Sequence, residues 1–107
     1  IAQSAAGVAV MARQFSFTPG GGPANVLLVA PPAVTSLTDL DQLFAEAVEK
    51  SRQFSRYFRL FAERRCLPDF DAGSVIASSE VDGIHFEADA HRTLGEAMAG
   101  EVRRLIG

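Results

Sequence analysis

Cysteine is nearly absent from this chain of 107 residues, since Cys66 is the only one. A single cysteine cannot form an intrachain disulfide, so the sequence gives no sign of secretion and favours a cytoplasmic location. Cys66 stands next to the apolar Leu67, at the start of an expected strand. We therefore expect Cys66 to be a small buried hydrophobic side chain and not a nucleophile.

Long hydrophobic runs and basic clusters are also lacking. The longest apolar run, Val26 to Pro32, is far too short to cross a bilayer. The net charge of -3 argues against nucleic acids and anionic membranes as partners, because both attract a basic face. The pairs Arg64-Arg65 and Arg103-Arg104 stand near expected helix ends, where a cation offsets the helix dipole. We expect the protein to bind neither nucleic acid nor membrane.

Apolar residues, in contrast, make up 48% of the chain. That is enough for one small core, and the chain is too short for two domains. Apolar spacings of three and four residues predict helices, and two shorter apolar runs predict strands. The expected order is helix, strand, helix, strand and helix, over residues 1–15, 25–30, 37–65, 66–72 and 86–106.

In the expected strand at residues 25–30, all residues from Val26 to Ala30 are apolar, which is typical of a parallel strand covered on both faces. Two strands joined by a helix are almost always parallel. Because two strands alone cannot bury such a segment, we expect further strands from upstream polypeptide. The chain starts at Ile1, not Met, within an expected helix, so we expect it to begin inside a domain.

Asp82 and His85 stand three residues apart, just before the last expected helix. The ends of a four-residue turn lie within about 7 Å, so the carboxylate can face the imidazole across Gly83 and Ile84. An aspartate bonded to one ring nitrogen leaves the other nitrogen as a base. The loop is also expected beyond the carboxyl ends of the strands, where open parallel sheets bind ligands. Taken alone, these four residues favour a turn-stabilising aspartate beside a surface histidine, and it is the placement of the loop that supports a catalytic pair.

Five ordered segments of the chain resemble SGNH hydrolases, also called GDSL esterases and lipases, and most of all their bacterial arylesterase and acyltransferase branch. These segments are Val26 to Pro32, Glu49 to Ser51, Phe70 to Ile76, Asp82 to Phe86 and His91 to Gly95. The likeness runs over the whole chain. It covers only the C-terminal half of a family domain, so we expect residues 1–107 to be a C-terminal fragment of one such domain.

The resemblance implies an α/β fold, namely the C-terminal part of a flavodoxin-like three-layer α/β/α arrangement with parallel strands. It implies a serine esterase that hydrolyses carboxylic esters through an acyl-serine intermediate and can pass the acyl group to an alcohol. By position, His85 resembles the general base and Asp82 the acid that orients it. The family's nucleophilic serine and its oxyanion donors have no counterpart here, so the chain alone is expected to be inactive. The resemblance implies a small ester substrate and no metal or organic cofactor.

The other serines and His91 are expected to have structural roles. Ser74 is expected to cap or bend its loop, and Ser78 and Ser79 to hydrogen-bond to backbone. For Ser51, a helical position favours packing or solvent contact over catalysis. His91 is expected to lie on the polar flank of the last helix or to hydrogen-bond to a neighbouring loop, and not to bind a ligand.

A metal site made of His85, Asp89 and His91 is disfavoured, because spacings of four and two cannot share one helical face. An aromatic stripe is more typical of a core than of an acyl pocket; it consists of Phe54, Tyr57, Phe58 and Phe61. The alternative function is a non-catalytic flavodoxin-like interaction module with an unpaired strand. Homo-oligomerisation is left open by the sequence.

Overall fold

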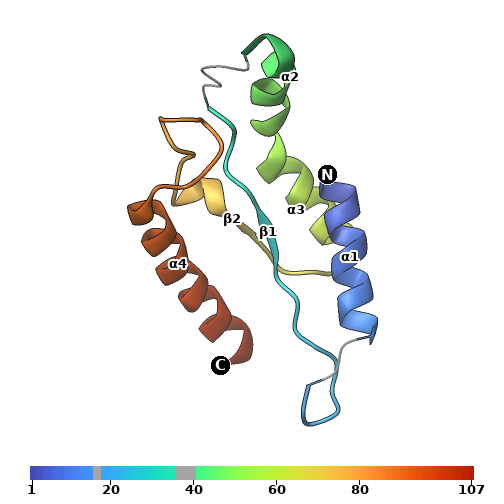
Figure 1. The fold of residues 1–107 in the computed structure, drawn as a ribbon. Helices are drawn as coiled ribbons and strands as arrows, with labels where there is room; N and C mark the ends of the chain where they lie inside the picture. The colour runs from blue at the N-terminus through green and yellow to red at the C-terminus, as the bar shows by residue number, and fades with distance from the viewer. Residues whose placement is uncertain (16–17, 36–40) are drawn as a thin grey trace.

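The computed structural model describes residues 1–15, 18–35 and 41–107, without the side chains of residues 41–45. The elements follow the expected alternation of helices and strands (Figure 1). They are α1 (Ala2–Phe15), β1 (Leu28–Ala30), α2 (Asp41–Ser51), α3 (Phe54–Arg64), β2 (Asp69–Asp71), the 3-10 helix η1 (Ala72–Ser74) and α4 (Ala88–Ile106).

The two strands form a parallel sheet in which Val29 lies opposite Phe70. Both strands are shorter than predicted, because only residues 28–30 and 69–71 pair. Helices α1 and α3 lie on one side of this sheet and α4 on the other (Figure 1). The predicted three-layer α/β arrangement with parallel strands is therefore confirmed. The last helix begins at Ala88, two residues later than predicted.

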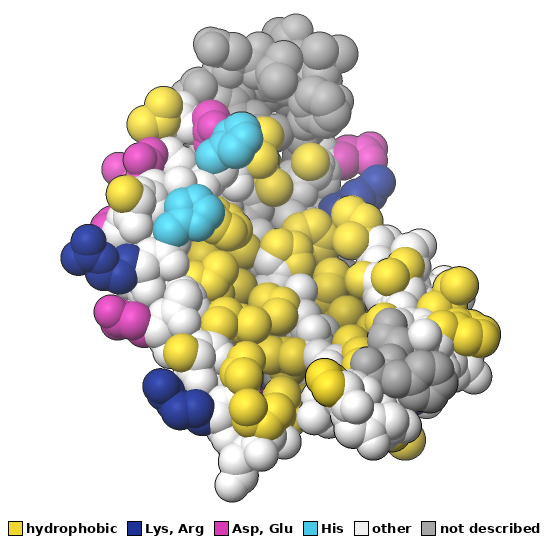
Figure 2. Space-filling model, turned by 60° about the horizontal axis from the view of Figure 1, so that its bottom comes forward, with side chains coloured by type: hydrophobic (Ala, Val, Ile, Leu, Met, Phe, Trp, Pro, Cys, Tyr) yellow, Lys and Arg dark blue, Asp and Glu magenta, His cyan; other side chains and the backbone are white. Residues whose placement is uncertain are grey.

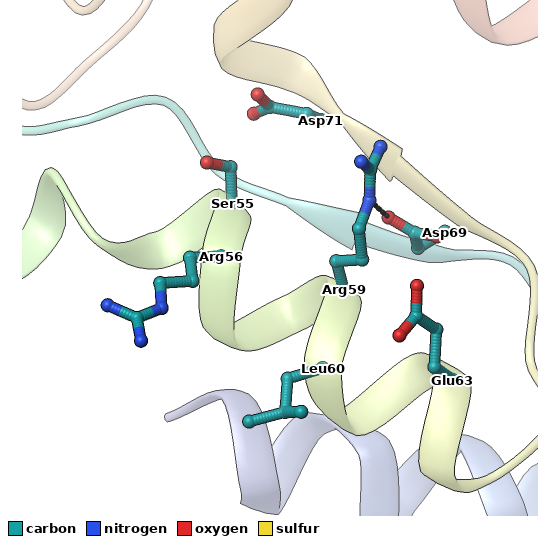
Figure 3. Close-up of a pocket in the computed structure, with 7 residues that line it drawn as sticks. All are labelled: Ser55, Arg56, Arg59, Leu60, Glu63, Asp69 and Asp71. Atoms are coloured by element: carbon teal, nitrogen blue, oxygen red, sulfur yellow. Dashed lines mark ion pairs between the residues drawn. The ribbon is translucent and has the colours of Figure 1, made fainter.

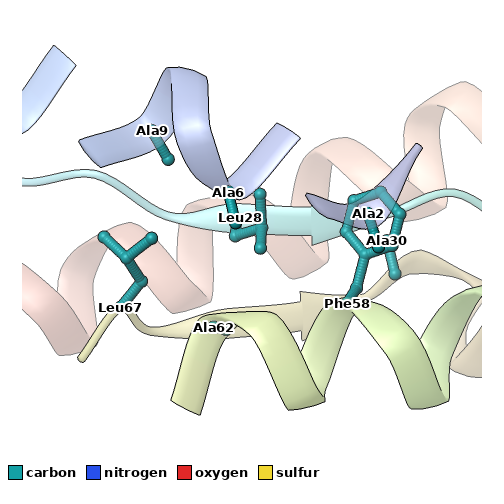
Figure 4. Packing of buried hydrophobic residues seen from close by; sticks show 8 residues of the cluster. All are labelled: Ala2, Ala6, Ala9, Leu28, Ala30, Phe58, Ala62 and Leu67. Atoms are coloured by element: carbon teal, nitrogen blue, oxygen red, sulfur yellow. The ribbon is translucent and has the colours of Figure 1, made fainter. Parts of the chain in front are cut away.

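The core lies between the sheet and the helices α1 and α3 (Figure 4). Small side chains on one face of α1 allow this helix to approach the strand closely, and Phe58 of α3 fills the remaining space. The buried cluster consists of Ala2, Ala6, Ala9, Leu28, Ala30, Phe58, Ala62 and Leu67. Phe54 and Phe61 pack against it, whereas Tyr57 is 41% exposed. Core packing, as predicted, accounts for the aromatic stripe with the exception of Tyr57.

The opposite face of the sheet is much less covered. Helix α4 buries none of its residues, and Figure 2 shows a broad apolar surface beside the two histidines. The radius of gyration is 15.5 Å, against about 13 Å for a compact domain of this length. The chain is therefore more open than a self-contained domain. No described helix is long and apolar enough to cross a membrane.

The prediction of one helix over residues 37–65 is wrong, and its residues 37–40 lie outside the described part of the chain. Helix α2 ends at Ser51 and α3 begins at Phe54. The Ser51 hydroxyl donates to the Val48 carbonyl at 2.8 Å and accepts from the Val34 N–H at 2.8 Å. A serine that bonds back to the preceding helical turn competes with the backbone ladder and bends the helix. The predicted helix is therefore interrupted at Ser51, whose hydroxyl binds the segment that follows β1.

The prediction that Cys66 is buried is also wrong. Cys66 is exposed and has a φ of 53°, in the left-handed region. The Leu67 N–H donates to the Ala62 carbonyl at 2.9 Å, and the Cys66 N–H to the Glu63 carbonyl at 3.2 Å. This is the Schellman arrangement that ends a helix, with Cys66 at the position usually held by glycine. Leu67, only 6% exposed, takes the buried place instead.

Candidate active site

The turn from Asp82 to His85 brings the carboxylate and the imidazole together, as predicted. Asp82 Oδ1 accepts the Ile84 N–H at 2.8 Å and the His85 N–H at 2.9 Å. Asp82 Oδ2 is hydrogen-bonded to His85 Nδ1. Gly83 has a φ of 72°, a conformation that most side chains disfavour, so this glycine allows the turn to close.

The hydrogen bonds to Asp82 keep it ionised. The Ile84 N–H is the largest cause, followed by the His85 ring and the His85 N–H, and together they lower the pKa of Asp82 to about 2. A carboxylate bonded to Nδ1 favours the tautomer in which Nδ1 carries the proton and Nε2 has a free lone pair. The His85 side chain is 82% exposed. Nε2 is therefore accessible to an incoming group.

Two hydrogen bonds tie this loop to the segment that leaves β1. The Thr35 N–H donates to the Gly83 carbonyl at 3.0 Å, and the Ser78 hydroxyl donates to the Ala33 carbonyl at 2.8 Å. Since this segment follows the carboxyl end of β1, the loop lies on the side of the sheet where ligands are expected. The predicted placement is confirmed.

The remaining serines that the sequence drew attention to make backbone contacts. Ser74 donates to the Asp71 carbonyl at 2.7 Å. Ser78 and Ser79 are only 6% and 5% exposed, and Ser79 accepts the Val81 N–H at 3.0 Å. These contacts agree with the structural roles predicted for them. The sequence missed how Ser51 and Ser78 secure the segment after β1, because each contact joins residues far apart in the chain.

His91 lies on the exposed side of α4, as expected, and its ring meets Phe86 edge to face with centroids 5.4 Å apart. Among the described residues, no three His, Cys, Asp or Glu side chains are grouped so that they could hold a metal ion.

A charged hollow of about 480 Å³ lies between α3 and β2 (Figure 3). Arg59 Nε approaches Asp69 Oδ2 at 3.6 Å across it. The Arg59 side chain is 69% exposed, so this ion pair stabilises the fold only weakly. Neither Asp82 nor His85 lines the hollow, which therefore belongs to the outer edge of the sheet and not to the candidate active site.

No family model and no curated protein matches the chain, but solved structures do. The aryl esterase of M. smegmatis is 38% identical with a TM-score of 0.76 in its native form, and 34% identical with a TM-score of 0.78 in its inhibitor-bound form. Each match covers 95% of this chain and 51% of that enzyme.

A carbohydrate acetylesterase from Sinorhizobium meliloti is 29% identical with a TM-score of 0.81, over 97% of this chain and 49% of that enzyme. The chain thus spans about half the length of the esterases that it matches. These matches confirm the resemblance to SGNH-type esterases that is seen in the sequence.

Proposed function

We propose that this chain supplies the acid and base of a serine ester hydrolase. The observation that carries the proposal is the Asp82 carboxylate bonded to Nδ1 of an imidazole that is 82% exposed. An oriented imidazole with an accessible Nε2 can take a proton from a serine hydroxyl. The esterase activity of the structural neighbours supports the same reaction class.

In the proposed reaction, His85 removes the proton of a serine hydroxyl as that oxygen attacks the ester carbonyl. Asp82 stabilises the imidazolium that forms, and His85 then gives the proton to the departing alcohol. The acyl-serine is released by water, or by an alcohol if the acyl group is transferred. This mechanism requires no metal or organic cofactor.

The serine and the oxyanion donors would come from polypeptide outside these 107 residues. We propose that residues 1–107 are the C-terminal fragment of a single SGNH domain. The match to half of the esterase length and the poorly covered face of the sheet support this. Since one oxyanion donor is worth about 3 kcal/mol of transition-state stabilisation, the 107 residues alone should be inactive.

Hydrolysis of nitrophenyl acetate by the full-length gene product tests the proposal. We expect His85→Ala to lower kcat at least about a thousandfold, because the hydroxyl loses its base. His91→Ala, the matched control on α4, should stay within about twofold of the wild type. A His85→Ala protein that keeps the wild-type rate would refute the assignment of His85.

The open sheet edge favours one alternative, a non-catalytic module that pairs with another polypeptide through β1. The coding sequence upstream of Ile1 separates the two proposals. A Gly-Asp-Ser segment followed by a Gly-x-Asn-Asp segment supports the esterase. Absence of both segments, together with no ester hydrolysis, supports the interaction module.

A further inference from the structure

Ser79 uses all of its polar groups on the loop that carries Asp82 and His85. Its N–H donates to the His85 carbonyl at 2.7 Å, and its carbonyl accepts the Gly83 N–H at 2.7 Å. Its hydroxyl oxygen accepts the Val81 N–H at 3.0 Å and donates its own hydrogen to the Glu87 carboxylate. Ser79 is only 5% exposed, so solvent cannot easily replace these partners.

Glu87 connects this arrangement to the last helix. It is the N-cap residue of α4, and its carbonyl accepts the His91 N–H at 3.0 Å. A carboxylate at this position is also favoured by the positive end of the helix dipole. The hydroxyl of Ser79 thus links the loop to the N-cap of α4, while the Ser79 N–H holds the His85 carbonyl.

We propose that Ser79 is a positioning residue that holds the Asp82–His85 turn in its reactive geometry, with Glu87 as its anchor on α4. The proposal rests on the proposed esterase function. Ser79 acts through backbone and loop contacts and does not touch the reacting atoms. Small misplacements of a catalytic group can cost up to about a hundredfold in rate, so the hydroxyl should affect kcat more than KM.

Ser79→Ala in the full-length gene product tests this. We expect kcat for nitrophenyl acetate to fall about tenfold with KM within about twofold. The pKa of Asp82, followed by NMR of its carboxyl carbon, should rise from about 2, because the turn that presents the Ile84 and His85 N–H groups to it loosens. A purely structural role for Ser79 would leave that pKa unchanged.

Ser74→Ala is the matched control. The Ser74 hydroxyl donates to the Asp71 carbonyl at 2.7 Å, and this hydrogen bond lies outside the 79–85 loop. We expect this variant to show little change in kcat or in the pKa of Asp82. Equal loss of kcat in both variants, with the pKa of Asp82 unchanged, would overturn the proposal.

A double-mutant cycle that combines Glu87→Ala with Ser79→Ala tests the link between the two side chains. Glu87→Ala should lower kcat about threefold. The double variant Ser79→Ala/Glu87→Ala should have nearly the same kcat as Ser79→Ala alone, because each substitution removes the same Ser79–Glu87 hydrogen bond. Glu80→Ala removes an equally charged exposed side chain and serves as control. Fully additive losses would refute the link. If His85→Ala is itself active, the esterase assignment fails; if only the Ser79 variant is unimpaired, this inference alone fails.

Discussion

Asp82 shows how a carboxylate can be both held and kept charged by a few neighbouring residues. Two backbone N–H groups bind one oxygen and the His85 ring binds the other. The His85 ring is the only one of these three partners that belongs to a side chain. Most of what lowers the pKa of Asp82 therefore depends on the shape of the turn, and the imidazole adds to it.

Because the backbone N–H groups and the His85 ring both lower the pKa of Asp82, His85→Ala should remove only part of the shift. The pKa of Asp82 should rise from about 2 toward the ordinary value of 3.8 without reaching it, because the Ile84 and His85 N–H groups remain. NMR titration of the Asp82 carboxyl carbon measures the shift. An unchanged pKa would mean that the ring does not stabilise the carboxylate.

The same lowered pKa fixes the sign of the pH dependence. A depressed pKa means that folding favours the ionised form, so the contribution of Asp82 to stability is complete above about pH 4 and is lost as the pH falls toward about 2. Asp82 also stays ionised at neutral pH. A loss of activity near neutral pH would therefore not be due to protonation of Asp82.

Among the elements, the end of α3 determines which of two adjacent residues, Cys66 or Leu67, is buried. Leu67 is buried because the Schellman turn directs it inward, and Cys66 is left outside. Arg13 of α1 donates to the Cys66 carbonyl at 3.0 Å and to the Arg65 carbonyl at 2.9 Å. The end of α3 is therefore fixed both locally and by its neighbour in the fold.

Substitutions at Cys66 test whether this residue has an exposed, left-handed conformation or occupies a buried site. A left-handed conformation costs a non-glycine residue about 1–2 kcal/mol, while glycine loses about 0.4–1 kcal/mol through chain entropy. Cys66→Gly should therefore raise the free energy of unfolding by roughly 0.5–1 kcal/mol, and β-branched Cys66→Val should lower it by about 1 kcal/mol or more. Denaturant unfolding measures both. A stabilising valine would contradict the left-handed geometry and favour a buried site.

The whole molecule has one well-covered face and one open face. Leu28 and Ala30 are buried against α1 and α3, whereas Val29 on the other side is half-buried. The Leu28 N–H donates to the Pro68 carbonyl at 2.9 Å. Since alternate residues of a parallel strand bond to opposite sides, the N–H and carbonyl of Val29 point to the other edge of β1. Within the described part of the chain, no strand other than β2 joins the sheet, so a further strand can pair at that edge.

Hydrogen exchange at β1 tests whether such a strand is present in the full-length gene product. We expect the Val29 N–H to exchange fast in the 107-residue chain and slowly in the full-length product, because a neighbouring strand would bind it. The Leu28 N–H, bonded within the chain, is the internal control and should be protected in both. Fast exchange of Val29 in the full-length product would argue against a strand at this edge.

Features that depend on residues close together in the chain could be predicted from the sequence. Periodicity and apolar runs gave the order of elements and the parallel pairing, and four consecutive residues were enough to predict that Asp82 faces His85. These features follow from a few backbone dihedrals and from local spacing.

The helix break, the anchoring of the loop and the exposure of Cys66 could not be predicted, because they depend on the folded chain. The break at Ser51 depends on Val34, which is 17 residues away, and the hold on the loop by Ser78 depends on Ala33, which is 45 residues away. Cys66 is exposed because the adjacent Leu67 side chain, and not that of Cys66, packs in the core. The physical reason is that packing and long-range hydrogen bonds compete with local preference, and their partners are known only once the chain is folded.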